Sequence, residues 1–476
     1  MQPWSQPLLW PHPSGVVACD PYFGNVVLLD GFNGINGATA TTDESPSAHG
    51  SATFHGVAQL STTQAKFGTS SLFLGSGSLG YITWPDSNDW YFDGGNFTIE
   101  FWLYPLSYGS ANAFLIDQWG GGQNAWVLWW NVNQLSWNTA VAVTDNNFDI
   151  AAPASTPSLN AWHHIAIDSD GTKVRLYADG VMIASTTTVR NLANSTSLLA
   201  IGSDPVGTYI SQGYMDELRI TKGVARYASD SGFAVPTAAF PRVQCPDPHF
   251  AQVVLLMGFE DVNGSTGAPG MTDESSHAHG VATDNGNAAI STAQFKFGTS
   301  SLGLNTNPAL IKYLDSPDWQ LAASNTDQYT IECWVRLSTF TLDSYVLSQT
   351  SVGNRAFYLI LRHTTGDLEY GFSSDGTNWN VYASTSLGLT TGNWYFLTVD
   401  KDATGKVRVY SNGVMVASGT PANSAMFNST IELDIGALAG NNGIVGWMDE
   451  LRITKGTARY ANDAGFAVPT ARFPRS

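Results

Sequence analysis

The sequence has few cysteines and few basic residues, and it has no long apolar run. Only three cysteines occur in 476 residues, and their spacing matches no CxxC or zinc motif. Lysine and arginine number 21 against 39 aspartate and glutamate residues, a net charge of −18. That charge repels a phosphate backbone and no Lys/Arg stripe offsets it, so we expect no nucleic-acid partner. No apolar stretch approaches the ~20 residues of a membrane-spanning helix, so we expect no membrane insertion.

Residues 1–24 also lack the features of an export signal. The segment has neither a positive n-region nor an uninterrupted apolar region. Its prolines fix φ and remove backbone donors, so we expect an extended arm and not a domain. The arm is either a flexible tail or a docking segment anchored by Trp4 and Trp10, because exposed tryptophans on a free tail would be unusual.

The rest of the chain is one unit written twice. YMDELRITKG, which begins at Tyr214, returns as WMDELRITKG at Trp447, and VVLLDGF at Val26 returns as VVLLMGF at Val253. FGTSSL, TIE(F/C)W and a VRxY hairpin block recur in the same order. A full repeat of this kind predicts two copies of one fold.

The repeat sets the predicted domain borders. We expect an arm over residues 1–24, a first domain over 25–242, a Pro-rich linker over 243–250 and a second domain over 251–476. A unit of roughly 230 residues is within the range that all-β domains reach.

Short apolar runs are separated by segments rich in Gly, Asn, Ser and Thr, and no long amphipathic helix stands out. This pattern is typical of turn-rich antiparallel β-structure. In NFTIEFWLYP the apolar residues from Phe97 to Leu103 alternate, which predicts a strand with one core face. Pro105 should end that strand.

The order FGTSSL, TIEFW, AWHHIAI, LYADGVM and MDELRI resembles the concanavalin A-like lectin/glucanase superfamily, specifically its laminin-G-like jelly rolls. The resemblance covers nearly all of each repeat and implies an all-β fold of two tandem jelly-roll sandwiches. The ending DELRITKG-AR-Y is similar to domains of tailed-bacteriophage proteins. That likeness implies a virion-surface protein, as a tail fibre, adhesin or capsid-surface module, assembled in the host cytoplasm.

The segment after the closing strand, KGVARYASDSGFAVPTAAFP, should run across one end of the sandwich. Tyr227, Phe233 and Phe240 are the residues expected to hold it there.

The odd cysteine count and the large domains favour reduced thiols. Cys333 stands where the first copy has Phe101, so it is expected to be a small buried residue. Cys19 and Cys245 precede the two repeats at matching places, and a bridge between them is the alternative.

No catalytic constellation is evident. Glu100 in TIEFW and Glu332 in the second copy each lack a second carboxylate at the spacing that glycosidases use. We expect these glutamates to pair across the sheet with Arg219 and Arg452, and we expect no enzyme. The neighbours Asp216 and Glu217 should point to opposite faces of a regular strand.

Calcium is the metal that the resemblance implies, and no other cofactor is expected. Laminin-G-like domains often hold a calcium ion at a sandwich edge, and calcium binds loop carboxylates and carbonyls. The candidate ligands are Asp43, Asp216, Asp273 and Asp449. The alternative is that these aspartates cap turns.

For carbohydrate binding, exposed aromatic faces flanked by amide or carboxylate side chains are needed. Five tryptophans lie between residues 119 and 137, but Trp126 and Trp130 match apolar residues of the second copy and are expected in the core. Trp119 and Trp129 are the predicted binding residues.

Three hypotheses follow. The first is a non-enzymatic virion-surface protein that binds cell-surface glycan, docks through its arm to other virion proteins and forms a homo-oligomer. The second is a structural assembly protein without sugar affinity. The third is a polysaccharide hydrolase or lyase.

Overall fold

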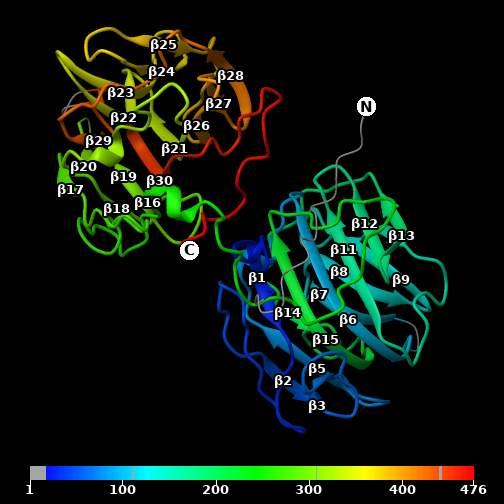
Figure 1. Cartoon of the computed structure of the whole chain (residues 1–476). Coiled ribbons are helices and arrows are strands. Elements are labelled where there is room, and N and C mark those ends of the chain that lie inside the picture. The colour runs from blue at the N-terminus through cyan, green and yellow to red at the C-terminus, as the bar shows by residue number, and fades with distance from the viewer. Residues whose placement is uncertain (1–17, 110–111, 307, 439–441) are drawn as a thin grey trace. The chain divides into compact units, whose positions relative to one another are not determined.

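Two compact units make up the chain, Met1–Cys245 and Pro246–Ser476, and they follow the two sequence repeats (Figure 1). We call them repeat 1 and repeat 2. Both are all-β, and in both, two antiparallel sheets face each other across a core. The predicted fold class, two tandem jelly-roll sandwiches, is confirmed.

The computed structural model describes residues 18–109, 112–306, 308–438 and 442–476. The predicted docking residues Trp4 and Trp10 lie outside these ranges. Within them the helical elements are short 3₁₀ turns: Phe23–Asn25, Asn88–Trp90, Phe250–Gln252 and Pro317–Trp319. No helix in the described part of the chain is long and apolar enough to cross a membrane.

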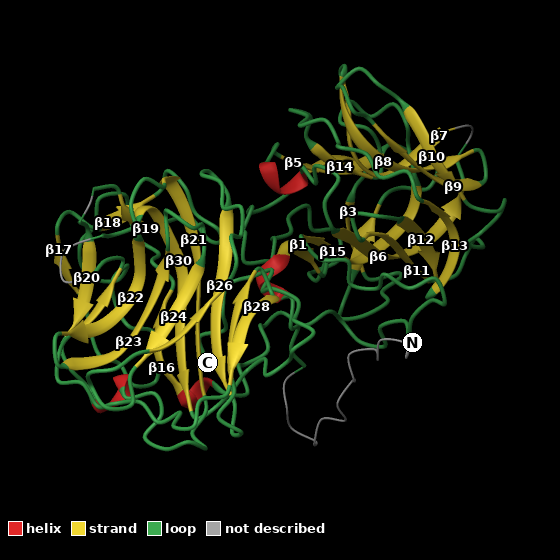
Figure 2. Cartoon of the chain, turned by 90° about the horizontal axis from the view of Figure 1, so that it is seen from above, coloured by secondary structure: helices red, strands yellow, loops and turns green. Residues whose placement is uncertain are grey.

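Repeat 1 has an eight-stranded and a seven-stranded sheet. The eight-stranded sheet has the order β13 (Val181–Thr186), β12 (Val174–Ala178), β11 (His163–Ser169), β6 (Phe97–Ser107), β15 (Gln212–Lys222), β4 (Ser71–Phe73), β3 (Gln59–Ser61), with β1 (Val26–Asp30) paired to β15. The seven-stranded sheet has the order β10 (Asn147–Ala151), β9 (Gln134–Thr139), β8 (Gln123–Asn131), β7 (Asn112–Gly120), β14 (Leu199–Ile201), β5 (Gly80–Trp84), β2 (Thr53–Gly56). Figure 2 shows the two layers, with β14, β8 and β7 in one and β15, β6 and β11 in the other.

Repeat 2 has the same topology. Its eight-stranded sheet has the order β18 (Ala289–Ser291), β19 (Ser301–Leu304), β30 (Val445–Lys455), β21 (Tyr329–Thr339), β26 (Trp394–Lys401), β27 (Val407–Ser411), β28 (Val414–Gly419), with β16 (Val253–Met257) paired to β30. Its seven-stranded sheet has the order β17 (Thr283–Asn285), β20 (Leu310–Tyr313), β29 (Leu433–Ile435), β22 (Ser344–Ser351), β23 (Asn354–Leu361), β24 (Leu368–Phe372), β25 (Asn380–Ala383).

The alternation in β6 is confirmed, because the apolar residues from Phe97 to Leu103 join the core between the sheets. The predicted end of this strand at Pro105 was wrong. Pro105 lies inside β6 opposite Gly213, where the register between β6 and β15 shifts. A proline is tolerated in a strand at such an irregularity, since no ladder hydrogen bond is needed from its nitrogen.

The closing strand β15 contains a bulge that the sequence analysis missed. Glu217 has a φ of 49°, and the register with β6 shifts between Asp216 and Arg219. Met215 and Leu218 both face the core although they are three residues apart. The expectation that Asp216 and Glu217 point to opposite faces of a regular strand was therefore wrong, because a bulge inserts an extra residue into the strand.

A buried ion cluster lies on the outer face of the eight-stranded sheet in repeat 1. Arg219 donates to Glu100 through Nε at 2.9 Å and Nη2 at 2.7 Å, and to Asp20 through Nη1 at 2.9 Å. The Tyr227 hydroxyl donates to the second oxygen of Glu100. Glu100 is fully buried and Arg219 is 5% exposed. Burial alone would raise the pKa of Glu100, but Arg219 and His164 hold it below its ordinary value.

Repeat 2 repeats this cluster. Arg452 donates to Glu332 at 2.7 Å and to Asp247 at 3.0 Å, and the Tyr460 hydroxyl donates to Glu332. The predicted cross-sheet pairs Glu100–Arg219 and Glu332–Arg452 are confirmed. The partners Asp20 and Asp247 precede the first strand of each repeat, so the cluster joins the start of a repeat to its closing strand.

The segment after the closing strand lies over this cluster. The prediction that it runs across one end of the sandwich was wrong. In repeat 1 the rings of Tyr227 and Phe233 stack with centroids 3.5 Å apart. The Phe240 ring lies 3.9 Å from the Arg219 guanidinium. The tail therefore covers the outer face of the eight-stranded sheet, because that face carries charges that need partners away from water.

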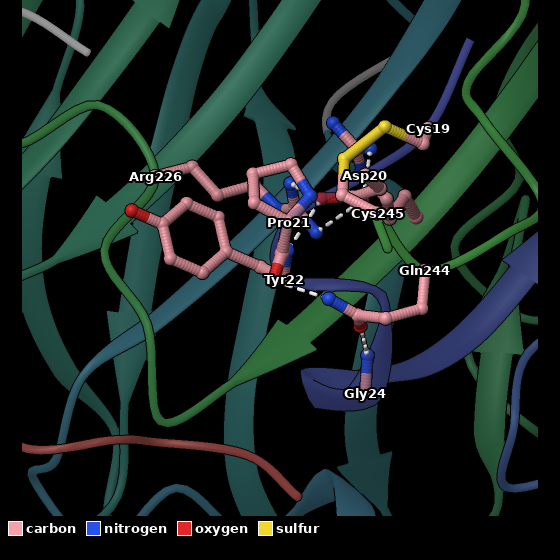
Figure 3. The surroundings of a disulfide bond; sticks show 9 residues. Cys19, Asp20, Pro21, Tyr22, Gly24, Arg226, Gln244 and Cys245 are labelled. Carbon is pink, nitrogen blue, oxygen red and sulfur yellow. Dashed lines mark hydrogen bonds and ion pairs between the residues drawn. A yellow bond between two sulfur atoms is a disulfide. The ribbon is translucent and has the colours of Figure 1, made fainter. Parts of the chain in front are cut away.

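A disulfide joins Cys19 to Cys245 in repeat 1 (Figure 3). The prediction of reduced thiols was wrong for this pair, and the alternative bridge is confirmed, while Cys333 is a free buried thiol as expected. The backbone explains the pairing: Asp20 N donates to Val243 O at 2.9 Å, and Cys245 N donates to Asp20 O at 3.2 Å.

These contacts show that repeat 1 extends beyond both of its predicted borders. Asp20 is buried and bonded to Arg226, although it falls in the segment assigned to the arm. Gln244 belongs to repeat 1, where its amide donates to Pro21 O, although it falls in the predicted linker. The border between the units follows Cys245.

Reduction of the disulfide should destabilise repeat 1 and leave repeat 2 unchanged. The bridge spans a sequence separation of 226 residues. Closing a loop of this length restricts the unfolded chain, with an upper limit of about 5 kcal/mol. Calorimetry with and without reductant should show one transition that falls by several degrees and one that stays. Two unchanged transitions in reduced protein would contradict the assignment.

Loss of one buried charge should be costly in either repeat. We expect Glu332→Gln to reduce the free energy of unfolding of repeat 2 by about 3–5 kcal/mol, because Arg452 would stay buried without its main partner. Glu432→Gln is the matched control in the same repeat. Its ion pair with Lys312 is partly exposed, so its loss should cost less than about 1 kcal/mol. Equal effects in urea unfolding would refute the difference.

Candidate functional site

Each sandwich has two outer faces, and the tail closes one of them. The face that remains belongs to the seven-stranded sheet. In repeat 1 it carries an aromatic group that we call the Trp129 platform, made of Phe114, Trp129, Phe148 and Tyr209. The core-facing neighbours Trp126, Leu128 and Trp130 point to the other side of β8, as the sequence analysis predicted for both tryptophans.

Cross-strand pairing assembles the platform. Phe114 of β7 lies opposite Trp129 of β8, with ring centroids 6.1 Å apart, and Phe114 also stacks on Tyr209 at 4.6 Å. Phe148 of β10 lies opposite Asn138 of β9. Phe148 is 52% exposed and Tyr209 is 36% exposed. Large apolar rings are thus presented to solvent on a rigid sheet.

Hydrogen bonds fix the central ring. Trp129 Nε1 donates to Asn138 Oδ1 at 3.0 Å, and Asn138 Nδ2 donates to Asn146 Oδ1 at 2.7 Å. The indole is therefore held in one orientation with its polar atom satisfied. Such a ring costs little conformational entropy when a ligand stacks on it.

The structure separates the two predicted binding tryptophans. Trp119 lies at the far end of β7, opposite Asn124, whereas Trp129 lies five residues beyond Asn124 on β8. At about 3.3 Å per residue the two positions are roughly 16 Å apart along the strand. Trp119 is half-buried and its backbone N donates to Asp117. Only Trp129 belongs to the platform.

Repeat 2 has different residues at these positions. The cross-strand pairing places Ile360 where repeat 1 has Trp129, and Gly371 where it has Asn138. Tyr358 and Trp379 form an aromatic pair there, with centroids 4.7 Å apart. The Tyr358 hydroxyl donates to Glu369 at 2.6 Å. Repeat 2 therefore keeps the same sheet with other residues at the places of Trp129 and Asn138.

Repeat 2 also has a groove of about 700 Å³ beside this sheet. Its lining combines the charged residues Lys312, Asp315 and Glu432 with the apolar Leu314 and Ile431. Lys312 and Glu432 form an ion pair at 2.8 Å. The groove of repeat 2 is therefore lined by charged residues, whereas the side chains of the Trp129 platform in repeat 1 are neutral.

Asp43 and Asp273, two of the predicted calcium ligands, accept backbone hydrogen bonds in turns. Asp43 accepts from the backbone N of Leu29, Ser45 and His49 at 2.8–3.0 Å. Asp273 has the equivalent bonds in repeat 2 and accepts from His279 Nδ1. Their oxygens already have donors, which a cation would have to displace. These two aspartates fit turn capping and not metal binding.

Asp216 and Asp449 likewise hold loops. Asp216 accepts from the backbone N of Lys66 at 2.7 Å and of Phe67 at 3.1 Å, and Asp449 does the same for Lys296 and Phe297. Burial raises the pKa of Asp216 to about 7 and that of Asp449 to about 8. Across the described residues, no group of three or more His, Cys, Asp or Glu side chains could hold a metal ion. The four predicted ligands do not fit calcium.

Two buried glutamates of repeat 1 are bound to structural partners. Glu217 accepts from Phe240 N and from Arg242, each at 2.7 Å. Glu100 is held by Arg219 and Tyr227. A glycosidase needs two carboxyl groups that face one sugar across a cleft. These glutamates instead face basic and hydroxyl groups of their own repeat.

Sequence reasoning missed the partners of Trp129 and one acidic pair. Tyr209 and Phe148 lie on other strands or loops, so only the sheet order brings them to Trp129. The acidic pair is Asp117 of β7 and Asp204, which follows β14; Asp117 is fully buried. Two features of the sequence could have identified Asp117. It is a carboxylate in the apolar context FLIDQW, and repeat 2 has Ser348 at the equivalent position.

The family profile described as "Concanavalin A-like lectin/glucanases superfamily" matches residues 76–226 and 312–460, together more than half of the chain. No curated protein sequence matches the chain significantly.

Solved structures match the chain at low identity and with TM-scores below 0.5. Domain 4 of AbnA, an extracellular arabinanase of Geobacillus stearothermophilus in complex with arabinotriose, is 21% identical over 44% of this chain and 94% of that domain, with a TM-score of 0.30. Mouse laminin alpha1 domains LG4-5 are 12% identical over 83% of this chain and 91% of those domains, with a TM-score of 0.24. The receptor-binding domain of botulinum neurotoxin D is 13% identical over 43% of this chain and 50% of that domain, with a TM-score of 0.33. This chain therefore spans half of that domain.

Proposed function

The chain belongs to the concanavalin A-like lectin/glucanases superfamily, and we propose that it is a non-enzymatic protein that binds glycan on the Trp129 platform of repeat 1. A sugar stacks the C–H face of its ring on an aromatic side chain and bonds its hydroxyls to amides at the rim. The platform offers the half-buried Trp129 and the exposed Phe148, with the exposed amide of Asn146 bonded to Asn138 between them.

The observation that carries this proposal is that Trp129 and Asn138 are found in only one of the two repeats. Repeat 2 keeps the same sheet with Ile360 and Gly371 at the places of Trp129 and Asn138. An indole with its nitrogen bonded to an amide, on the face that the tail leaves open, is therefore an addition to the scaffold. Binding residues added to a kept scaffold are how such domains acquire specificity.

Repeat 2 supports a second and different ligand. Its groove combines Lys312 with Asp315 and Glu432, so it suits a ligand with several polar or charged groups. We infer that the two repeats recognise different glycans or different parts of one glycan.

The absence of enzymatic activity is part of the proposal. Glu100 and Glu332 were the nearest candidates for a catalytic carboxylate, and each is buried against an arginine and a tyrosine. A general acid needs a pKa near the working pH and access to the substrate. The pKa of Glu100 is held below its ordinary value, and the tail separates it from solvent.

Trp129→Ile should weaken glycan binding by at least about tenfold without unfolding repeat 1. The exchange installs the residue that repeat 2 carries, so the sheet should accept it. Tenfold corresponds to about 1.4 kcal/mol of lost contact. The measurement is binding of the full chain to an array of bacterial polysaccharides, followed by calorimetric titration of the best ligand.

Trp119→Ala is the matched control and should bind like the unchanged protein. If Trp119→Ala loses binding and Trp129→Ile does not, the site lies at the other end of the hairpin. A wild-type chain that binds no glycan on the array would favour the assembly role. Oligosaccharide released from a bound polysaccharide would show an enzyme.

We further propose that the protein is displayed on the virion surface of a tailed bacteriophage, as a tail fibre, adhesin or capsid-surface module. The DELRITKG closing motif supports this placement. The Cys19–Cys245 bridge fits it, because disulfides persist on virion surfaces. Trp4 and Trp10 would dock the protein, as a homo-oligomer, onto other virion proteins. The measurement is mass spectrometry of purified phage particles. Particles in which this chain is not detected would exclude the placement.

A further inference from the structure

Ser158, His163 and Asp179 of repeat 1 form a chain of hydrogen bonds. His163 Nδ1 lies 2.6 Å from Asp179 Oδ2, and His163 Nε2 lies 3.0 Å from Ser158 Oγ. An ionised carboxylate can only accept a hydrogen bond, so Nδ1 carries the imidazole proton and donates to Asp179. Nε2 is then unprotonated and accepts from the Ser158 hydroxyl. In this arrangement a histidine can remove the proton of a serine.

Asp179 is positioned by the first residues of β11. It lies in the turn between β12 and β13, where its Oδ1 accepts from His164 N at 2.9 Å and its Oδ2 accepts from His163. Burial would raise the pKa of Asp179, but the hydrogen bonds from His163 and His164 hold it below its ordinary value. The His163 side chain is 13% exposed. The imidazole is therefore held between its two partners in one orientation.

Ser158 is exposed on a loop that is fixed on both sides. The Tyr108 hydroxyl donates to Pro157 O at 2.9 Å, and Asn160 N donates to Pro105 O at 2.8 Å. The Ser158 hydroxyl therefore meets the imidazole from an ordered backbone, and a molecule in solution can reach it.

Repeat 2 has the same contacts with different chemistry. WHH of repeat 1 corresponds to WYF of repeat 2, so Tyr395 stands at the place of His163, with its hydroxyl 3.2 Å from Thr390 Oγ1. Asn412 stands at the place of Asp179 and accepts from a backbone N of the neighbouring strand at 2.8 Å. A neutral phenol cannot take up a hydroxyl proton as an imidazole can. The base and its carboxylate thus belong to repeat 1.

We propose that Ser158 is a nucleophile that takes an acyl group from an activated carboxylic ester or thioester. Ser158 Oγ attacks the carbonyl carbon while His163 Nε2 removes the hydroxyl proton, and Asp179 stabilises the imidazolium that forms. The C–O or C–S bond of the donor then breaks, and the leaving alcohol or thiol receives the proton from His163. The product is an acyl ester on Ser158.

One acyl group per chain is expected. The leaving group of an aryl ester or a thioester is a weak base, so it departs readily from the tetrahedral intermediate. The new ester on Ser158 would have to lose a serine alkoxide, which is a much stronger base and a poorer leaving group. The acyl group therefore stays on Ser158, and the reaction is no catalytic cycle. It goes beyond the proposed glycan binding and does not rest on it.

The test is the reaction of the folded full chain with 4-nitrophenyl acetate. Mass spectrometry of the digested chain should find an acetyl group on Ser158, and the fast release of nitrophenolate should end near one equivalent per chain. Ser158→Ala should abolish the fast release and the adduct. Ser155→Ala is the matched control and should react like the unchanged chain. Ser155 is exposed nearby, but its hydroxyl accepts from Asn133 and does not meet a histidine.

Two further variants install the residues of repeat 2. His163→Tyr should slow the acetylation of Ser158 by about a hundredfold or more, because no base remains. Asp179→Asn should also slow it, and nitrogen NMR of the imidazole should show that the proton no longer resides on Nδ1. Calorimetry should show that both variants are folded. Thr390 should stay unlabelled in every chain.

Three results would overturn the proposal. One is an unchanged chain that carries no acetyl group on Ser158. Another is that folded His163→Tyr acetylates Ser158 as fast as the unchanged chain. The third is a release of nitrophenolate that depends on Ser158 and continues well beyond one equivalent, because the acyl group would then be lost to water and the chain would be an esterase. If Asp179→Asn does not fold, His163→Tyr and the unchanged chain decide the same question.

Discussion

The buried pair of an arginine on the closing strand and a glutamate on the central strand is the interaction on which each sandwich depends. Arg219 meets Glu100, and Arg452 meets Glu332. Charges on the outer face of a sheet would ordinarily lie in water. Here a tail must cover them, because the Tyr227 hydroxyl and the Phe240 ring complete the partners of the pair. The tail then closes that face to ligands, which leaves the seven-stranded sheet as the open surface.

The two repeats serve as controls for each other. Residues found in both copies, such as the arginine–glutamate pair and the aspartates that hold loops, explain the fold. Residues found in one copy must have another reason. Trp129, Asp117 and the Cys19–Cys245 bridge belong to repeat 1 alone among the described residues. The bridge acts on the unfolded chain of its own repeat, so of these three features only Trp129 and Asp117 remain as candidates for function.

Local patterns predicted more of the structure than of the site. Alternation identified the core face of β6, and the pairing of Glu100 with Arg219 across the sheet was predicted correctly. The bulge at Glu217 was missed, because its φ of 49° depends on tertiary contacts and not on a glycine. The disulfide was given only as the alternative, because the argument from cysteine count and domain size did not consider that the end of a repeat returns to its start. The partners of Trp129 were missed because they come from separate strands.

A binding surface with one exposed indole on the seven-stranded sheet would give a modest affinity for a single sugar. A rigid indole gives up little entropy on binding, but one exposed ring supplies only modest energy. Two tandem domains could raise this by avidity if both bound the same ligand. Ile360 at the place of Trp129 argues against identical ligands. Under the proposed function the second domain would add specificity, since only a target that carries both determinants would engage both surfaces.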